Sequence, residues 1–326
     1  MRHVIPLAVL AAGAVCLHAE PYALEPGPAT VEQMDLDWHD GPRNRDVPVR
    51  IYYPKDGAGP FPVIVFSHGL GGTRENYTLH GRHWASYGYV VCHVQHVGSD
   101  DAVWRDVPAL QRLAAMRRAA ADPRNAIERP RDITFALDQL TALNAAPGPL
   151  QGRLDLKHIG MAGHSFGGYT TLAASGEAFP VGGRVYSLAD PRITASIAMS
   201  APSAKAKDTL DQSFGAIKIP ILYLTGTKDD SPIGETKAGE RREPYDHSNV
   251  PGQTLIIFKG ADHMVFSGPP RRIGQDVNDA RFDDLLHECC TAWWDAWLKG
   301  DAKAKQWLLA GGFAAEMGGD GTFETK

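Results

Sequence analysis

Short apolar, β-branched runs recur along the chain and alternate with segments that have the periodicity of helices. Some of these runs, such as Val63–Phe66, are apolar at every position, which is typical of strands buried on both faces of a sheet. The runs that predict strands are Val49–Tyr53, Val63–Ser67, Val90–Val94, His158–Ala162, Ile193–Met199, Ile221–Thr225 and Thr254–Phe258.

Two segments carry apolar residues at helical spacing, Asp132–Leu143 and Phe282–Leu298. Strands that alternate with helices predict an α/β fold, a mostly parallel central sheet with helices on both faces. We find no internal repeat and no Pro-rich linker, so residues 20–326 are expected to form a single domain. Segments 98–131 and 231–252 are too polar or too broken for central strands, and we expect insertions at the edge of the sheet there.

The first residues resemble an export signal. Arg2 and His3 precede the apolar run Val4–Leu17, which has the length of a signal-peptide core and is too short to span a bilayer. We therefore expect a signal peptide over residues 1–19 and a mature protein that is periplasmic or secreted. Lipid attachment at Cys16 and a buried N-terminal helix are the alternatives. No later segment has the roughly 18 uninterrupted apolar residues of a membrane helix, so stable membrane insertion is not expected.

Composition and charge narrow the possible partners. Hydrophobic residues make up 43% of the 326 residues and charged residues 22%, as in ordinary globular proteins. The net charge is −5, and it becomes −6 when residues 1–19, which include Arg2, are removed. A negative chain has no general attraction to phosphate backbones, so nucleic acid is not an expected partner.

Cysteines and arginines each leave two interpretations open. Removal of the signal peptide leaves Cys92, Cys289 and Cys290. Packed free thiols are expected, and one disulfide from Cys92 to a C-terminal cysteine is the alternative in an oxidising compartment. The arginine-rich segment from Arg105 to Arg131 predicts a solvated helix face or a lid over a substrate pocket.

The strongest chemical signal lies at residues 163–168, which read Gly-His-Ser-Phe-Gly-Gly between a predicted strand and a predicted helix. In this setting Gly-x-Ser-x-Gly forms a sharp turn that lifts the serine to the rim of the sheet. The glycines on either side allow strand and helix to approach each other. The pattern predicts Ser165 as a nucleophile, and a glycine-rich structural turn is the alternative.

A serine nucleophile needs a base and an acid that orients the base. His263 follows the predicted strand Thr254–Phe258 and is the expected base, with His247 as second choice. Asp229 and Asp230 both stand on the turn after another predicted strand, and we favour Asp229 as the acid because it follows a glycine by three residues. Asp262 is a third candidate, although side chains of adjacent residues usually diverge.

Negative charge that develops on the substrate oxygen needs preorganised donors. The backbone amide of Phe166, just after the serine, is the first expected donor. The second is the amide of Leu70 in the glycine-rich segment 67–72, for which a plain turn is the alternative. His96 comes just after a predicted strand, with Trp104 nearby, and both are candidate substrate contacts, with turn-forming and packing roles as the alternatives.

Four motifs in this order resemble the α/β-hydrolase superfamily over residues 49–298. They are His68-Gly-Leu-Gly-Gly, Gly163-His-Ser-Phe-Gly-Gly, Gly226-Thr-Lys-Asp229 and Gly260-Ala-Asp-His263. Within the superfamily, the first two motifs resemble the dienelactone-hydrolase-like and platelet-activating-factor acetylhydrolase-like branch, which borders the bacterial polyester hydrolases.

The resemblance implies a serine hydrolase that cleaves a small or polymeric carboxylic ester through a Ser165–His263–Asp229 triad and an acyl-enzyme. It implies no metal and no organic cofactor, and the histidine pairs His80/His83 and His93/His96 lack a third ligand. A serine nucleophile argues against dienelactone hydrolysis, which uses cysteine. Acetylhydrolases tend to place the acid after the strand that corresponds to 193–199, where this chain has no Asp, and this argues against phospholipid-type substrates. An amidase, peptidase or lactonase with the same triad, and a catalytically silent binding protein, are the alternatives.

Overall fold

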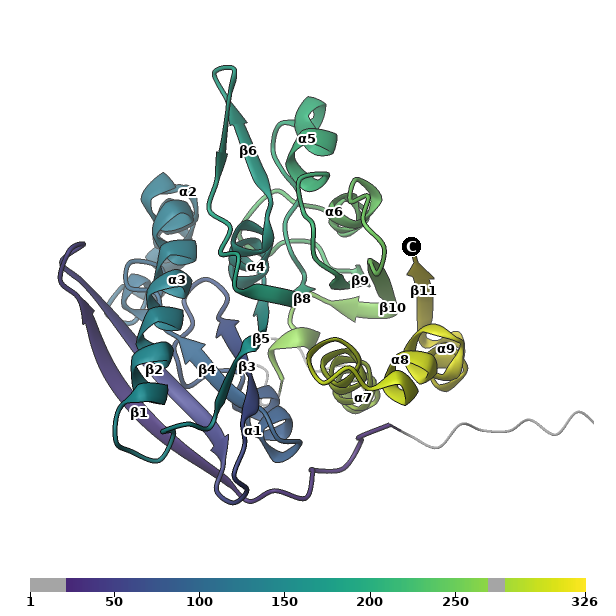
Figure 1. The fold of residues 1–326 in the computed structure, drawn as a ribbon. Coiled ribbons are helices and arrows are strands. Elements are labelled where there is room, and N and C mark those ends of the chain that lie inside the picture. Colours follow the sequence, from purple (N-terminus) through teal and green to yellow (C-terminus); the bar gives the residue numbers. More distant parts are fainter. Residues whose placement is uncertain (1–21, 269–278) are drawn as a thin grey trace, which may run out of the picture.

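The computed structural model describes residues 22–268 and 279–326, and a nine-stranded sheet forms its centre (Figure 1). The order across the sheet is β1-β2-β4-β3-β5-β8-β9-β10-β11. The strands are β1 (Val31–Asp40), β2 (Arg45–Pro54), β3 (Phe61–Ser67), β4 (Val90–Val94), β5 (Leu154–His164), β8 (Ile193–Met199), β9 (Ile221–Lys228), β10 (Thr254–Asp262) and β11 (Gly321–Thr325). The expected signal peptide and Cys16 lie outside the described residues, so both remain predictions.

The sheet is mostly parallel, as the sequence predicts. Strands β4, β3, β5, β8, β9 and β10 run in one direction, and the pairs β1–β2, β2–β4 and β10–β11 are antiparallel. Each of the seven predicted strands lies within a strand of this sheet. The separate hairpin β6 (Ala178–Val181) and β7 (Arg184–Ser187), like the edge strands β1 and β11, was not predicted.

Helices cover both faces of the sheet (Figure 1). They are α1 (Thr78–Ser86), α2 (Ala109–Ala121), α3 (Pro123–Ala145), α4 (Phe166–Ser175), α5 (Leu210–Phe214), α6 (Glu243–Asp246), α7 (Asp279–Leu298), α8 (Ala302–Leu309) and α9 (Gly312–Met317). The two predicted helices lie within α3 and α7. The α/β-hydrolase architecture expected from the motifs is therefore confirmed.

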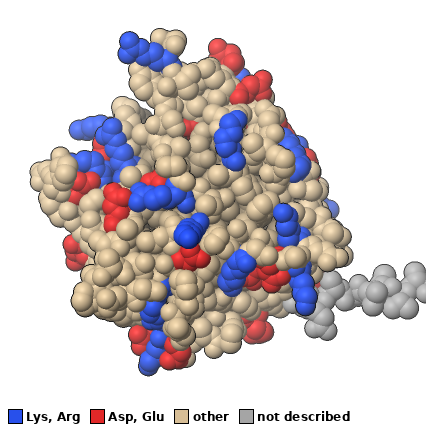
Figure 2. Space-filling view, viewed as in Figure 1, with Lys and Arg blue, Asp and Glu red and all other residues tan. Residues whose placement is uncertain are grey.

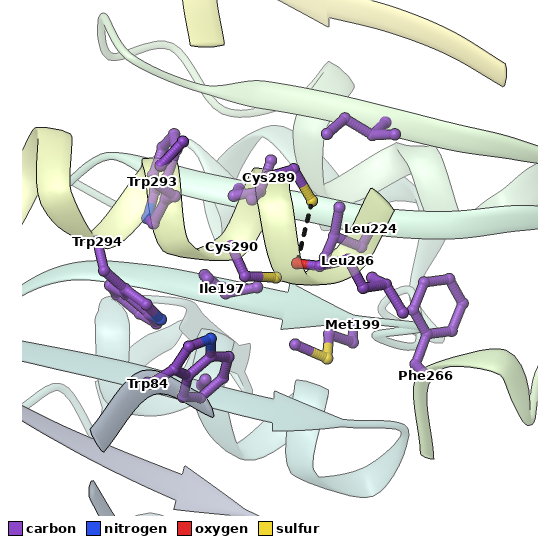
Figure 3. Packing of buried hydrophobic residues seen from close by; sticks show 14 of the residues in the cluster. Trp84, Ile197, Met199, Leu224, Phe266, Leu286, Cys289, Cys290, Trp293 and Trp294 are labelled. Carbon is purple, nitrogen blue, oxygen red and sulfur yellow. Dashed lines mark hydrogen bonds between the residues drawn. The ribbon is translucent and has the colours of Figure 1, made fainter. Parts of the chain in front are cut away.

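The core has a different aromatic content on the two faces. On one face, Trp84 of α1 and Trp293 and Trp294 of α7 pack over the central strands (Figure 3). On the other face, α3 packs its aliphatic residues against β2, β3, β4 and β5. Each face of the sheet is thus sealed by helices, and the ends of its strands are left to carry polar chemistry.

The cysteines belong to opposite faces of the sheet. Cys92 of β4 lies in the cluster under α3, whereas Cys289 and Cys290 lie in the α7 cluster (Figure 3). All three are buried and free. The alternative of a disulfide from Cys92 to the C-terminal helix is wrong, because the sheet itself separates the thiols.

The two segments expected as insertions are helical. Residues 98–131 contain a short 3₁₀ helix (Asp101–Val103), α2 and the start of α3, and residues 231–252 contain the 3₁₀ helix Ala238–Arg242 and α6. Basic and acidic side chains are interspersed on the face of the molecule shown in Figure 2. None of the described helices combines the length and apolar character needed to cross a bilayer.

Candidate active site

Ser165 occupies the sharp turn between β5 and α4. Its backbone has φ 59° and ψ −115°, a conformation that residues other than glycine rarely adopt. Its amide donates to the carbonyl oxygen of Met199 on the neighbouring strand at 2.9 Å, which holds the turn in place. The strained turn predicted from Gly-x-Ser-x-Gly is therefore present in the structure.

The glycines beside Ser165 allow the close approach that the turn needs. A Cβ atom on Gly163 would lie 2.3 Å from the carbonyl oxygen of Gly167. A Cβ atom on Gly167 would lie 1.9 Å from the carbonyl oxygen of Ser67 at the end of β3. Helix α4 thus starts in contact with the loop that follows β3, and no larger residue fits between them.

The structure brings Ser165, His263 and Asp229 together although they are far apart in the sequence. The Nε2 atom of His263 lies 2.8 Å from Oγ of Ser165, and its Nδ1 atom lies 2.6 Å from Oδ1 of Asp229. His263 follows β10 and Asp229 follows β9, so both stand at the carboxyl ends of parallel strands. Asp229 has no exposed surface.

The other candidate acids and bases lie elsewhere. The side chain of Asp230 is 56% exposed and accepts a hydrogen bond from the amide of Ala238, which fixes the next turn. Asp262 accepts at 2.8 Å from the backbone amide two residues later. His247 is paired with a different aspartate at 2.6 Å. The structure thus brings Asp229, rather than Asp230 or Asp262, to His263.

Asp229 has three further partners that the sequence patterns do not indicate. Ser200 and Thr225 donate to its Oδ2 atom at 2.6 and 2.8 Å. The Nε atom of Arg241 lies 2.9 Å from Oδ1 and donates to the backbone carbonyl of Asp229 at 2.6 Å. Arg241 is buried, and this burial lowers its pKa. Every oxygen of the carboxylate is therefore held by at least two groups.

Ser200 stands directly after β8, the strand end at which the resemblance described above implies an acid. Its φ of 49° turns the chain sharply at this point, and its amide donates to the carbonyl oxygen of Leu224 at 2.7 Å. The strand end that lacks an acid thus supplies a hydrogen-bond donor to the acid of the next strand, Asp229.

The two expected oxyanion donors lie on segments that touch each other. Leu70 belongs to the loop after β3, and Phe166 is the first residue of α4. The loop is held by a hydrogen bond from the amide of Gly71 to the carbonyl oxygen of Ser99 at 2.8 Å. Among the residues that the structure describes, none accepts a hydrogen bond from the amide of Leu70 or of Phe166.

His96 and Trp104 differ in their access to a substrate. His96 is fully buried, with Nε2 2.9 Å from Oγ of Ser67 and Nδ1 3.0 Å from Asp132, and its burial lowers its pKa to about 3. Because no atom of His96 reaches the surface, we assign it a structural position and correct its expected role as a substrate contact. Trp104 donates from Nε1 to the carbonyl oxygen of Gly71 at 2.8 Å, and its substrate contact stays a prediction.

The histidines considered as metal ligands are engaged in packing. His83 stacks on His287 with ring centroids 4.1 Å apart, and His80 stacks on Trp84 at 5.5 Å. His93 lies with Nδ1 3.1 Å from a backbone carbonyl oxygen. Within residues 22–268 and 279–326, no three His, Cys, Asp or Glu side chains gather as metal ligands do.

Comparisons with known proteins agree on one family. Residues 44–107 match the family model of platelet-activating factor acetylhydrolase, isoform II, a range that includes the loop after β3. Platelet-activating factor acetylhydrolases are among the similar curated proteins. That of Cavia porcellus is 28% identical over 154 residues, covering 40% of this chain and 35% of the relative.

Two further relatives carry the same name. The protein from Canis lupus familiaris is 24% identical over 233 residues, covering 64% of this chain and 48% of the relative. The protein from Bos taurus is 28% identical over 170 residues, covering 39% and 37%. This chain therefore spans less than half the length of these relatives.

Sheet order, the turn at Ser165 and the sequence similarities lead to the same result. The resemblance seen in the motifs is confirmed. The chain has the α/β-hydrolase fold and is similar to the platelet-activating factor acetylhydrolases.

Proposed function

We propose that this protein is a serine hydrolase that cleaves a carboxylic ester through Ser165, His263 and Asp229. The observation that carries the proposal is the unbroken series of hydrogen bonds from the Ser165 hydroxyl through the imidazole to a buried carboxylate, with lengths of 2.8 and 2.6 Å. A hydroxyl becomes a nucleophile when a base accepts its proton and an acid orients that base. The acetylhydrolase names of its relatives support ester hydrolysis as the reaction class.

The reaction proceeds in two halves. Oγ of Ser165 attacks the ester carbonyl carbon while Nε2 of His263 takes the hydroxyl proton. The bond from carbon to the leaving oxygen then breaks, and His263 gives the proton to the departing alcohol. A water molecule repeats the sequence on the acyl-enzyme, releases the carboxylic acid and restores the serine. Asp229 holds Nδ1 of the imidazole throughout and stabilises its protonated form.

The carbonyl oxygen becomes negative in both halves and receives hydrogen bonds from the amides of Leu70 and Phe166. Two observations support this role. The loop after β3 and the start of α4 are in contact, and no described residue accepts from either amide. The amide of Phe166 also lies at the N-terminus of a helix, where the helix dipole favours negative charge.

We propose short-chain acyl esters, acetyl esters first, as the substrate class, with the small or polymeric nature of the alcohol part left to measurement. The absence of an Asp after β8 means only that the triad acid comes from another strand, and Asp229 after β9 fills this role in the proposal. This absence is therefore no argument against a phospholipid substrate. Phospholipid-type esters therefore belong in the same substrate panel. The apolar run Val4–Leu17 supports export as the route to this substrate.

The test uses the purified full chain with p-nitrophenyl esters of increasing acyl length, lactones, soluble polyesters and phospholipids. We expect Ser165→Ala to lower kcat by about 10³-fold or more, because the triad acts as a unit. Ser187→Ala, an exposed serine on β7, serves as the matched control and should keep full activity.

A fluorophosphonate should label the wild type and Ser187→Ala but not Ser165→Ala. The proposal fails if the wild type turns over no ester faster than Ser165→Ala and takes up no label. Faster cleavage of a matched anilide than of the ester would reassign the protein to amide hydrolysis.

A further inference from the structure

A charged side chain is buried beneath the proposed oxyanion site. Arg129 of α3 has no exposed surface. Its Nε atom donates to the hydroxyl of Thr170 at 2.9 Å and its Nη1 atom to the hydroxyl of Ser99 at 2.8 Å. Its Nη2 atom donates to the hydroxyl of Ser67 at 2.9 Å and to the backbone carbonyl of His68. All four acceptors are uncharged oxygens.

These contacts join the segments that carry the two oxyanion donors. The loop after β3, which Arg129 holds at its start, leads directly to Leu70. Helix α4, which Arg129 holds one turn in, begins at Phe166, and the guanidinium lies over the ring of Phe166 at 4.5 Å from its centroid. Arg129 also holds Ser99 in the loop after β4, and the carbonyl oxygen of Ser99 accepts a hydrogen bond from the amide of Gly71. One side chain therefore links the three segments that lie around the two amides: the loop after β3, the loop after β4 and helix α4.

The charge of Arg129 has no directly contacting counterion among the described residues. Two acidic residues lie near it along the helix, and both are engaged by other groups. Glu128 pairs with Arg43 and Arg131, and Asp132 is bound by Arg43, Arg45 and His96. Burial lowers the pKa of Arg129 to about 9, so the side chain still carries its charge at pH 7. Burying a charge without a paired carboxylate is costly, and here the hydrogen bonds to four neutral oxygens offset part of that cost.

We propose that Arg129 is the positioning residue of the oxyanion site. It fixes the amides of Leu70 and Phe166, and its positive charge favours the negative charge that develops on the substrate oxygen between them. In a buried setting such preorganised donors and charges act far more strongly than in water. The inference rests on the proposed ester hydrolysis and goes beyond it, because it predicts a defect confined to stabilising the oxyanion.

The test compares phenyl acetate with its thionoester, in which sulfur replaces the carbonyl oxygen. Sulfur is larger and a poorer hydrogen-bond acceptor, so the thionoester draws less benefit from oxyanion donors. For Arg129→Met, with active sites counted by fluorophosphonate titration, we expect kcat on phenyl acetate to fall about 100-fold with KM changed less than about threefold. The ratio of oxoester to thionoester kcat should fall about tenfold, which partial unfolding alone would not produce.

Three further variants make the outcome decisive. Arg131→Gln, which removes a half-exposed arginine from the same helix, should leave the ratio unchanged. Arg129→Lys keeps the charge but not the forked hydrogen bonds, so its ratio should lie between wild type and Arg129→Met. If Arg129→Met does not fold, Thr170→Val removes one anchor and should lower the ratio in the same direction.

An unchanged ratio in the folded Arg129 variants, or in Thr170→Val if neither folds, overturns the inference. The proposed function fails separately, through a lack of Ser165-dependent turnover in wild type and in Arg131→Gln. The two failures are therefore distinguishable in one set of measurements.

Discussion

Asp229 and Asp230 are neighbours in the sequence and lie in opposite environments. The carboxylate of Asp229 is fully buried and bound by His263, Ser200, Thr225 and Arg241. That of Asp230 lies in solvent, and the hydrogen bond from the amide of the 3₁₀ helix at 238–242 lowers its pKa. Two adjacent aspartates thus have different roles: Asp229 orients the imidazole of His263, and Asp230 caps a turn.

This contrast predicts different effects for two similar substitutions. Asp229→Asn should lower kcat by about 10³- to 10⁴-fold, because an amide cannot stabilise the protonated imidazole of His263 and can reverse its tautomer. Asp230→Asn should change kcat less than about twofold. Steady-state kinetics on one ester with both variants gives the comparison, and equal losses would contradict the assignment of Asp229.

At the scale of residues, sequence patterns predict the groups that stand at fixed offsets from a strand end. Ser165 and His263 are of this kind. Arg129 and Arg241 are not, because each lies in an arginine-containing segment whose pattern does not tell which guanidinium turns inward. His96 follows a strand as a substrate contact would, but its side chain points into the protein. Only the tertiary fold decides such orientations.

The junction of β5, α4 and the loop after β3 is the element on which the site depends. Gly167 lies at the point of closest approach, with backbone atoms on the facing side, so no side chain can move aside to admit a Cβ atom. The same junction presents Ser165, Leu70 and Phe166. A change in the packing at Gly167 therefore also changes the geometry of the site.

Gly167→Ala should destabilise the protein by about 3 kcal/mol or more, because the added atom forces a backbone shift. Activity should fall even where the variant is folded, since the shift moves Leu70 and Phe166. Gly319→Ala is the control, because a Cβ atom there meets nothing within 4 Å. Urea unfolding curves and kcat of both variants check this, and a fully active, stable Gly167→Ala would refute it.

At the scale of elements, the central strands are predictable because they are buried on both faces and read as continuous apolar runs. The edge strand β1 alternates exposed and half-buried residues, and the hairpin β6–β7 has mostly exposed or half-exposed residues. Their sequences carry no such apolar signal. Pairing with a neighbour rather than burial makes them strands, and that pairing is not visible in a local pattern.

Buried histidines dominate the proton linkage of the whole molecule. Burial lowers the pKa of seven described histidines, and the opposite shift occurs in Glu177, whose pKa burial raises to about 8, and in Glu288, with a pKa of about 7. The histidines are His68, His80, His83, His93, His96, His164 and His287.

The sign of the pH dependence follows from the proton count. Below about pH 6.5 the unfolded chain binds protons at these histidines that the folded protein does not bind, so acid favours unfolding. The two glutamates act in the reverse sense, because the folded protein keeps their protons up to pH 7 or 8. Seven histidines outweigh the two glutamates and Asp284, whose pKa burial also raises, between pH 4.5 and 6.5. Above that range the glutamates lower the stability as the pH rises.

We therefore expect the free energy of unfolding to be greatest near pH 6.5 to 7. It should fall by about 4 kcal/mol or more on going to pH 5, at about 1.4 kcal/mol per unit of pKa shift for each group, and decline gently towards pH 8. Urea unfolding at pH 5, 6, 7 and 8 measures this profile. A stability that is flat or rising towards pH 5 would contradict the burial of neutral histidines.

The position of Arg241 matters for anyone who redesigns this scaffold. The segment between β9 and β10 looks like a surface excursion that could be trimmed, yet it delivers the guanidinium that clamps Asp229. Shortening this segment would remove Arg241 and with it the contacts that hold the carboxylate of Asp229. The hairpin β6–β7, with its exposed tip at Val181–Tyr186, is the place to graft a tag or a new recognition loop.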